Sequence, residues 1–153
     1  MTTRPATRAD IPTIVTFNLG IAAETEDHQL DPTIVTPGVT RFFDEPAYGF
    51  YTVAESTAGD VVGGLLITYE WSDWRNGLFW WIQSVYVHPD HRRTGVFRAL
   101  HAHVHQLAEA DDVACGLRLY ADKDNTRAHD TYTSLGFKKT TYLIFEQYPL
   151  SGD

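Results

Sequence analysis

The chain has 153 residues, 43% of them hydrophobic, and a formal net charge of -8. This length and composition predict one globular domain, residues 1–153, with its own apolar core, and they exclude a disordered chain. The acidic balance argues against nucleic-acid binding, which needs lysine and arginine to displace counterions from phosphates. The N-terminal stretch MTTRPATRADIP lacks the apolar segment of a secretory signal, no stretch is apolar enough to span a membrane, and one cysteine permits no intramolecular disulfide. We therefore expect a cytoplasmic protein that binds neither membranes nor nucleic acids.

Helices and then an antiparallel hairpin are predicted for the first half of the chain. Apolar residues recur at helical spacing after Asp10, which can cap a helix, and a polar break separates that helix from a second one. The expected elements are an extended segment following Pro5, a helix from Ile11, a helix at 33–43, and hairpin strands at 49–56 and 61–70. Gly63 and Gly64 indicate a bulge or a close backbone approach within the second hairpin strand.

Strands and helices alternate in the second half. The run LFWWIQSVYV (78–87) is long, apolar and rich in β-branched and aromatic residues, which is typical of a buried central strand. The elements expected after it are an amphipathic helix from Gly95 to Ala110, a strand at 115–121, a helix within 122–137 ended by Gly136, and a closing strand at 140–148. Because a helix joins 78–87 to 115–121, those two strands should be parallel. The prediction is an α+β fold with a twisted, mixed, mostly antiparallel sheet, flanked by helices, with one central parallel strand pair.

The segment HRRTGVFRAL (91–100) concentrates three arginines on a turn at the start of a helix. A helix N-terminus presents unpaired N–H groups and the positive end of the helix dipole, both of which bind anions. Gly95 lets the backbone approach a phosphate closely, and Arg92 and Arg93 can add bidentate contacts. The nucleotide-binding glycine patterns GxxxxGK[ST] and GxGxxG are absent. The turn therefore predicts a site for one small anionic ligand, with a solvated basic turn as the alternative.

Two segments of the chain carry a family resemblance. Arg92 and Gly95, directly after a strand, match the pattern Q/R-x-x-G-x-G/A, although Phe97 stands where that pattern has Gly or Ala. Such a side chain either crowds the turn or points into the core. Downstream, NTRAHDTYTSLGF (125–137) resembles a second segment of the same family. With the order of the elements, these motifs resemble the GNAT superfamily of acyl-CoA-dependent N-acyltransferases over nearly the whole chain.

This resemblance implies acetyl-CoA as acyl donor and direct attack of a primary amine on its acetyl carbonyl in a ternary complex. In the family, backbone amides of the basic turn hold the pyrophosphate of coenzyme A, and amides of the preceding strand hold pantetheine and the acetyl oxygen. The implied cofactor-binding residues are Val85, Val87, Arg92, Arg93, Thr94, Gly95, Val96, Phe97, Arg98 and Asn125. Tyr132 corresponds to a tyrosine near the thioester sulfur, which makes it the expected general acid, because a phenol is protonated at neutral pH.

The general base is not evident from the sequence. Some family members carry a carboxylate on the central strand, where this chain has none. Glu70 and Glu24 are the remaining catalytic candidates. The alternatives are that both are solvated surface carboxylates and that water relays the proton to bulk solvent.

Acidic and aromatic side chains predict the acceptor. The charge of Glu26 and its acidic neighbours suggests a small cationic amine, on a small molecule or a peptide. Trp71 and Trp74 can add cation–π contacts to its pocket, or instead cover the hairpin edge or a homodimer surface. Antibiotics, polyamines, amino acids and lysine side chains all stay open as acceptors.

Three other residues are interpreted as structural. His101 and His105 share a helix face, but no third ligand is evident, so we expect a solvated face and no metal. Cys115 is expected to be a small buried hydrophobe.

Two rival functions stay open, namely a non-catalytic acyl-CoA-binding or regulatory domain and an unrelated phosphate- or nucleotide-binding module.

Overall fold

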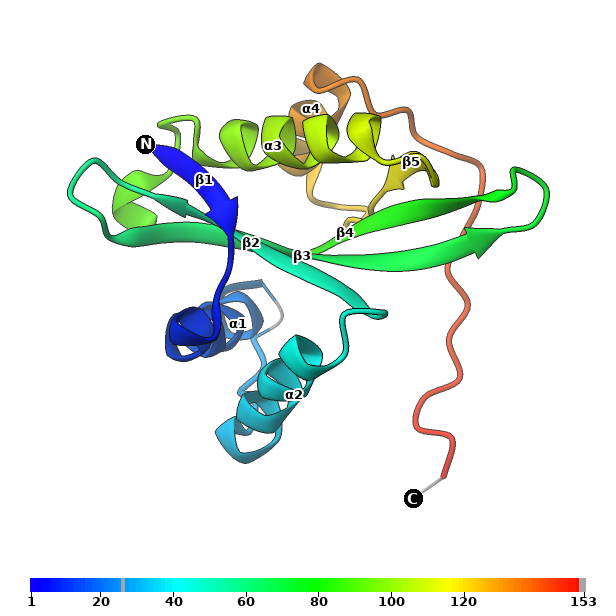
Figure 1. Ribbon diagram of the computed structural model, residues 1–153. Coiled ribbons are helices and arrows are strands. Elements are labelled where there is room, and N and C mark those ends of the chain that lie inside the picture. The colour runs from blue at the N-terminus through cyan, green and yellow to red at the C-terminus, as the bar shows by residue number, and fades with distance from the viewer. Residues whose placement is uncertain (26, 152–153) are drawn as a thin grey trace. The chain divides into compact units, whose positions relative to one another are not determined.

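A computed structural model describes residues 1–25 and 27–151 of the chain (Figure 1). The chain divides into two compact units, residues 1–119 and residues 120–153, which we describe separately. The first unit holds the sheet with helices α1 (Ile11–Thr25), α2 (Pro32–Asp44) and α3 (Val96–Ala110), and the second holds α4 (Thr126–Ser134). All four agree with the predicted helices. Within the described residues, no helix is long and apolar enough to cross a membrane.

The sheet of the first unit has five strands in chain order, β1 to β5. The strands are β1 (Thr2–Pro5), β2 (Gly49–Glu55), β3 (Val61–Ser72), β4 (Gly77–Val87) and β5 (Ala114–Arg118). All neighbouring pairs are antiparallel except β4–β5, which is parallel as the connecting helix predicted. The predicted α+β fold class is therefore confirmed. One boundary was wrong, since Pro5 is the last residue of β1, whereas the extended segment was predicted to follow it.

Helices α1 and α2 cover one face of the sheet, and α3 covers the other (Figure 1). Ile14 and Val15 of α1 and Val39 of α2 are buried with Tyr51 of β2 in one apolar cluster. Their spacing within each helix places them on a single face, as the sequence periodicity predicted. This packing fixes α1 and α2 side by side over the middle of the sheet.

Helix α3 lies close to β3 at one glycine. A Cβ atom on Gly63 would lie 2.8 Å from Cγ1 of Val96 and 2.9 Å from the carbonyl oxygen of Tyr86. Since real Cβ atoms do not approach so closely, the position admits only glycine, and the predicted close approach is confirmed. Leu100 and Val104 of α3 are completely buried against the sheet. The start of α3, which carries the basic turn, is therefore fixed in place.

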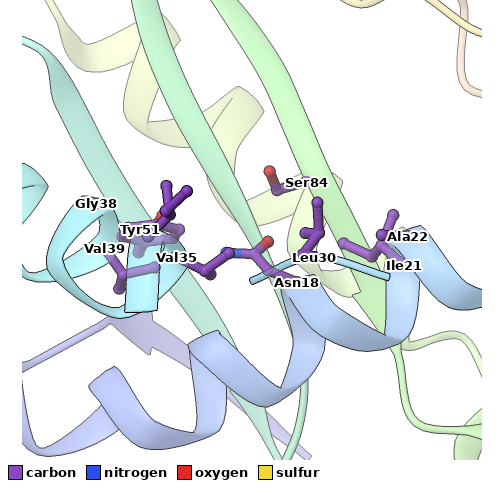
Figure 2. Close-up of a pocket in the computed structure, with 10 residues that line it drawn as sticks. Asn18, Ile21, Ala22, Leu30, Val35, Gly38, Val39, Tyr51 and Ser84 are labelled. Carbon is purple, nitrogen blue, oxygen red and sulfur yellow. The ribbon is translucent and has the colours of Figure 1, made fainter. Parts of the chain in front are cut away.

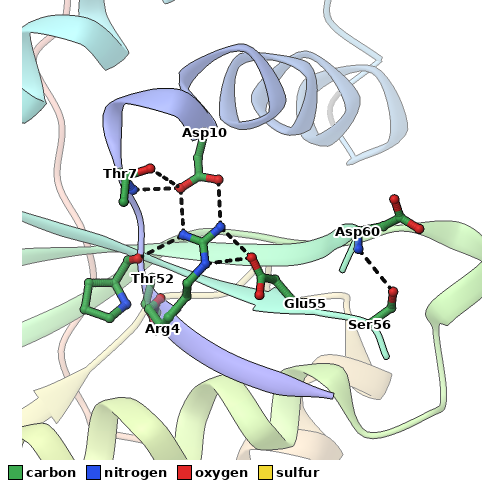
Figure 3. Close-up of polar contacts among 8 residues, drawn as sticks. Arg4, Thr7, Asp10, Thr52, Glu55, Ser56 and Asp60 are labelled. Carbon is green, nitrogen blue, oxygen red and sulfur yellow. Dashed lines mark hydrogen bonds and ion pairs between the residues drawn. The ribbon is translucent and has the colours of Figure 1, made fainter. Parts of the chain in front are cut away.

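Arg4 joins β1 to the segment that leads into α1 (Figure 3). Its guanidinium donates to both carboxylate oxygens of Asp10, at 2.8 and 3.0 Å, and to Glu55 at 2.7 Å. Asp10 also accepts from the backbone N–H of Thr7 at 2.7 Å. Asp10 does precede α1 directly, but its carboxylate binds Arg4 and Thr7, so it does not cap the helix as predicted.

The predicted closing strand at 140–148 is wrong. These residues form no strand in the described part of the chain, and the side chains of Leu143 and Phe145 are 78% and 91% exposed. Alternating apolar residues favour a strand only where another strand supplies hydrogen-bond partners. As a result β5 is the last strand of the sheet, and it ends at Arg118, three residues earlier than predicted. Cys115 on this edge strand is exposed, where burial was predicted.

Helix α4 of the second unit begins and ends as its sequence predicts. The side-chain oxygen of Asn125 accepts from the backbone N–H of Ala128 at 3.1 Å, which caps the first turn. Gly136 adopts a φ of 91° just beyond the last turn. The ring of Tyr132 packs against that of Phe137 with 6.0 Å between centroids. The motif 125–137 therefore forms a short capped helix whose Tyr132 ring packs against Phe137.

Candidate active site

A bulge interrupts β4 at Ser84. The pairing with β3 passes from Leu66↔Gln83 to Gly64↔Tyr86, so one residue of β3 faces two residues of β4. Ser84 has a φ of 49°, in the left-handed region that is unusual for residues other than glycine. The bulge lies three residues beyond Trp81, the last residue of β4 that pairs with β5.

The parallel strands β4 and β5 separate at this point. Their last pair is Trp81↔Arg118, whereas β4 continues to Val87. The N–H of His88 donates to the carbonyl of Val62 in β3 at 2.8 Å, and successive residues of a strand alternate in direction. The amides of Val85 and Val87 therefore point away from β3, toward the side where β5 has ended. The separation leaves these two N–H groups without a strand partner among the described residues.

The turn after β4 leads directly into the N-terminus of α3. Arg93 and Gly95 both have positive φ, at 63° and 88°. Gly95 is the N-cap of α3, and no side chain caps the helix there. A Cβ atom on Gly95 would meet nothing within 4 Å. The amides of Val96, Phe97 and Arg98 precede the first bond of the helix, from the N–H of Ala99 to the carbonyl of Gly95 at 3.0 Å. Such unpaired amides at a helix start can bind an anion.

The arginines of the turn differ in what they contact. Arg92 donates from Nε to the carbonyl of Val87 at 3.0 Å and from Nη2 to Glu24 of α1 at 2.6 Å. Arg92 thus joins the end of β4 to the end of α1. Arg93 and Arg98 are exposed and form no ion pair with a described residue. They remain available to an anionic ligand, whereas the Arg92 guanidinium is already engaged.

Side chains of α3 are arranged partly as predicted. Phe97 is half-buried, so it neither fills the turn nor lies fully in the core. Leu107 has the helical spacing of the buried Leu100 and Val104, yet it is 36% exposed. His101 is only 7% exposed, where a solvated face was predicted, and burial lowers the pKa of its imidazole. A helix that lies flat on a twisted sheet buries a face that also includes His101.

A pocket of about 410 Å³ lies between α1, α2 and the sheet (Figure 2). Its walls are mostly aliphatic, and its residues are Asn18, Ile21, Ala22, Leu30, Ile34, Val35, Gly38, Val39, Tyr51 and Ser84. Asn18 hydrogen-bonds the hydroxyl of Tyr51, whose pKa is raised by burial, so the phenol is neutral at physiological pH. Because Ser84 lines the pocket, the pocket reaches the β4 bulge and adjoins the amide of Val85. Sequence reasoning missed these residues, although the spacing of Asn18, Ile21 and Ala22 marks one helix face.

The predicted catalytic glutamates and the two acceptor tryptophans do not line this pocket. Glu70 binds Arg118 at 2.7 Å, and the guanidinium of Arg118 lies 3.6 Å from the centroid of the Phe79 ring. Trp71 and Trp74 at the β3–β4 turn are 56% and 88% exposed. Neither tryptophan lines the pocket, and neither do Glu24 and Glu70. Glu26 lies outside the described residues.

The general-acid candidate belongs to the second unit. Burial raises the pKa of the Tyr132 hydroxyl above its ordinary value near 10. The phenol is therefore protonated throughout the physiological range, which is the state a general acid requires. Asn125, in the same helix, uses its side-chain oxygen as the helix cap, which leaves its NH₂ group as a donor.

Comparison with known proteins identifies the family of the chain. Residues 19–137 match the model of the acetyltransferase (GNAT) family. A possible acetyltransferase from Clostridium difficile 630 is 39% identical, with a TM-score of 0.91 and 98% of each chain covered. An aminoglycoside acetyltransferase from an uncultured soil metagenomic sample shares the fold at 18% identity, with a TM-score of 0.72 and 98% of each chain covered. No curated protein matches. The motifs, the separated parallel strands and these matches lead to one conclusion: the chain belongs to the GNAT acetyltransferase family.

Proposed function

We propose that this protein transfers the acetyl group of acetyl-CoA to a primary amine by direct attack in a ternary complex. The observation that carries the proposal is the pair of Val85 and Val87 amides on β4, which point past the end of β5. They lie between the uncapped start of α3 on one side and the pocket beside Ser84 on the other. A donor held along β4 would therefore place its acyl group at the mouth of an acceptor pocket.

The basic turn is the proposed site for the pyrophosphate of acetyl-CoA. The amides of Val96, Phe97 and Arg98 lie at the positive end of the α3 dipole. The hydroxyl of Thr94 donates to the carbonyl of His91 at 2.6 Å and so supports the turn. Arg93 adds a free guanidinium. Arg92 contributes by holding Val87 and α1 in place. The donors present here fit a diphosphate, because none of these groups carries negative charge.

Acyl transfer needs one bond formed and one broken. The amine nitrogen attacks the thioester carbonyl, and the amide of Val85 or Val87 donates to the oxygen as negative charge develops on it. As the C–S bond breaks, Tyr132 and Asn125 are the proposed groups at the sulfur and the pantetheine arm, and Tyr132 gives its proton to the thiolate. The amine first loses a proton. Glu24 and Glu70 are each bonded to an arginine, so we assign that proton to water at the open, exposed Ser84 end of the pocket.

The first test is ligand-induced thermal stabilisation with acetyl-CoA, ATP and NAD in parallel. A ligand at a hundredfold its Kd stabilises the folded protein by about 2.7 kcal/mol. We expect a shift with acetyl-CoA alone, and its loss in Gly95→Asp, which places a carboxylate in the anion site. Gly59→Asp is the matched control, because Gly59 has a φ of 90° and the same open surroundings at a hairpin turn. A shift with ATP or NAD instead, or an equal loss in both variants, contradicts the proposal.

Tyr132→Phe tests the chemical step. We expect kcat to fall by about 10²-fold, since general acid catalysis contributes on that scale, with the Kd for acetyl-CoA unchanged. Tyr142→Phe, at a 75% exposed tyrosine of the same unit, is the control. Thiol release measured with a panel of amines gives kcat. Equal turnover of Tyr132→Phe and the unmodified protein would assign the proton to another donor. Acetyl-CoA binding without turnover of any amine would instead support a non-catalytic binding domain.

A further inference from the structure

The pocket between α1 and α2 specifies the kind of amine that is acetylated. We propose that the acceptor carries a single amino group on an apolar body, with the body between the two helices and the nitrogen at Ser84. This inference rests on the proposed acetyl transfer, because it assigns the pocket to the acceptor of that reaction.

Charge is the first argument. None of the described residues that line the pocket is ionised, since the only polar side chains among them are Asn18, Tyr51 and Ser84. A polyamine or aminoglycoside entering this space would bring ammonium groups out of water with no carboxylate to pair with them. Asp31, next to Leu30 in the sequence, accepts from the backbone N–H of Thr33, and Glu24 binds Arg92. Neither carboxylate lines the pocket. A second positive charge on the acceptor therefore has no carboxylate partner among the described residues that line the pocket.

Two of the three polar side chains of the wall are paired with each other. Tyr51 is 8% exposed, and Asn18 hydrogen-bonds its hydroxyl. The floor around this pair is aliphatic, with Val39 and Ala22 at 3% and 5% exposure. Figure 2 shows side chains of α1 and α2 facing one another across this space. An acceptor body that is aliphatic or aromatic matches these walls, whereas a polyhydroxylated one would lose hydrogen bonds to water.

Position is the second argument. The pocket extends from the helices to Ser84, the residue directly before Val85 on β4. An amine whose apolar body fills the helix end of the pocket therefore presents its nitrogen at the bulge, beside the amide proposed to hold the acetyl oxygen. The exposed Ser84 and the 70% exposed Ile34 show that the pocket is open to solvent, which gives the acceptor access.

The test is a homologous series of n-alkylamines, from propylamine to heptylamine, alongside spermidine and kanamycin. Each methylene buried in an apolar pocket strengthens binding by about fourfold. We expect KM to fall by about that factor per methylene until the chain outgrows the pocket, and both polycations to be poor acceptors. Binding of heptylamine to the protein without acetyl-CoA, measured by calorimetry, gives a readout that does not need turnover.

Two substitutions connect the result to this pocket. Ile34→Asp places a charge on its wall at an exposed position, and we expect it to raise the KM and Kd for heptylamine at least tenfold. Val113→Asp makes the matched change at a 44% exposed residue outside the pocket and should leave both constants unchanged. In Gly38→Leu the new side chain starts in open space and occupies part of the pocket, so the optimum of the series should move to shorter amines.

The outcomes separate the two proposals. The inference is overturned if spermidine or kanamycin is acetylated in preference to the alkylamines. It is also overturned if KM changes neither with the length of the alkyl chain nor in Ile34→Asp. Either result is still compatible with acetyl transfer. Heptylamine binding that depends on Ile34 without any thiol release keeps the pocket assignment and overturns acetyl transfer. Absence of both binding and turnover overturns both.

Discussion

Arg4 and Arg92 each join two distant parts of the first unit through a carboxylate, yet their surroundings differ. Arg4 binds both oxygens of Asp10, whose side chain is 8% exposed, and Glu55 as well. Arg92 binds one oxygen of Glu24, and these two side chains are 41% and 42% exposed. The first arrangement is a nearly closed network, and the second is a single ion pair at the surface. Arg4, which supports the fold, is enclosed by its carboxylate partners, whereas Arg92, at the proposed binding turn, stays accessible to solvent.

The largest expected change is in the free energy of unfolding when the Arg4 network is broken. Asp10→Asn leaves the guanidinium without its main partner in a half-buried place, and we expect the free energy of unfolding to fall by about 2 kcal/mol. Urea denaturation measures this change. Asp60→Asn is the control, at an exposed carboxylate on the β2–β3 turn (Figure 3). Equal and small losses in both variants would mean that the network does not stabilise the fold.

The same network predicts a dependence on pH. The hydrogen bond from Arg4 holds the pKa of Asp10 below its ordinary value near 3.8. A carboxyl whose pKa is lower in the folded state stabilises it above the unfolded pKa, and that contribution disappears as the pH falls through the folded pKa. Unfolding free energy measured from pH 5 downward should therefore decrease less steeply in Asp10→Asn than in the unmodified protein. Parallel curves would contradict this account.

An intermediate effect is expected at Arg92. Arg92→Ala removes an exposed ion pair, so stability should fall by less than about 1 kcal/mol. The Kd for acetyl-CoA should rise about tenfold, because Val87 and the turn lose the bond that positions them. Arg8→Ala, which breaks the exposed pair with Asp44 away from the turn, should leave the Kd unchanged. If Arg92→Ala instead behaves like Asp10→Asn, the contrast between the two arginines fails.

The smallest effect is expected at Glu24. Because its carboxylate binds Arg92, Glu24→Gln should reduce kcat/KM by less than about threefold, the value of one exposed ion pair, and by the same factor at every pH. Rate profiles from pH 6 to pH 9 provide the measurement. A loss of kcat/KM confined to one limb of the pH profile would identify Glu24 as the general base. In that case Glu24, and not water, accepts the proton of the amine.

The two halves of the site were not equally predictable from the sequence. The turn at Arg92 to Gly95 was predicted as an anion site because such a site needs only consecutive backbone amides and one glycine, so the whole sequence signal lies in a short segment. The pocket proposed for the acceptor is lined by residues that lie between Asn18 and Ser84 in the sequence. Only the packing of α1 and α2 on the sheet brings these residues together. Acidic residues near these helices therefore suggested a charged pocket, while folding pairs Glu24 with Arg92.

Strand prediction succeeded and failed for a related reason. Apolar runs at 61–70 and 78–87 became β3 and β4 because each has a neighbour. The run at 140–148 has an equally favourable composition but no strand partner in the described part of the chain. The bulge at Ser84 was also invisible, since serine is an ordinary strand residue and nothing in LFWWIQSVYV indicates a positive φ there.

The separation of β4 from β5 has a consequence for hydrogen–deuterium exchange. Along one short stretch of strand, amide protons alternate between two situations. Those of Tyr86 and His88 face β3 and are protected, whereas those of Val85 and Val87 face the side that β5 has left. Neighbouring amides in a single strand should thus exchange at different rates, and a donor bound along β4 would slow the faster pair. The exchange pattern of the free protein should therefore mark the two amides that we propose bind the donor.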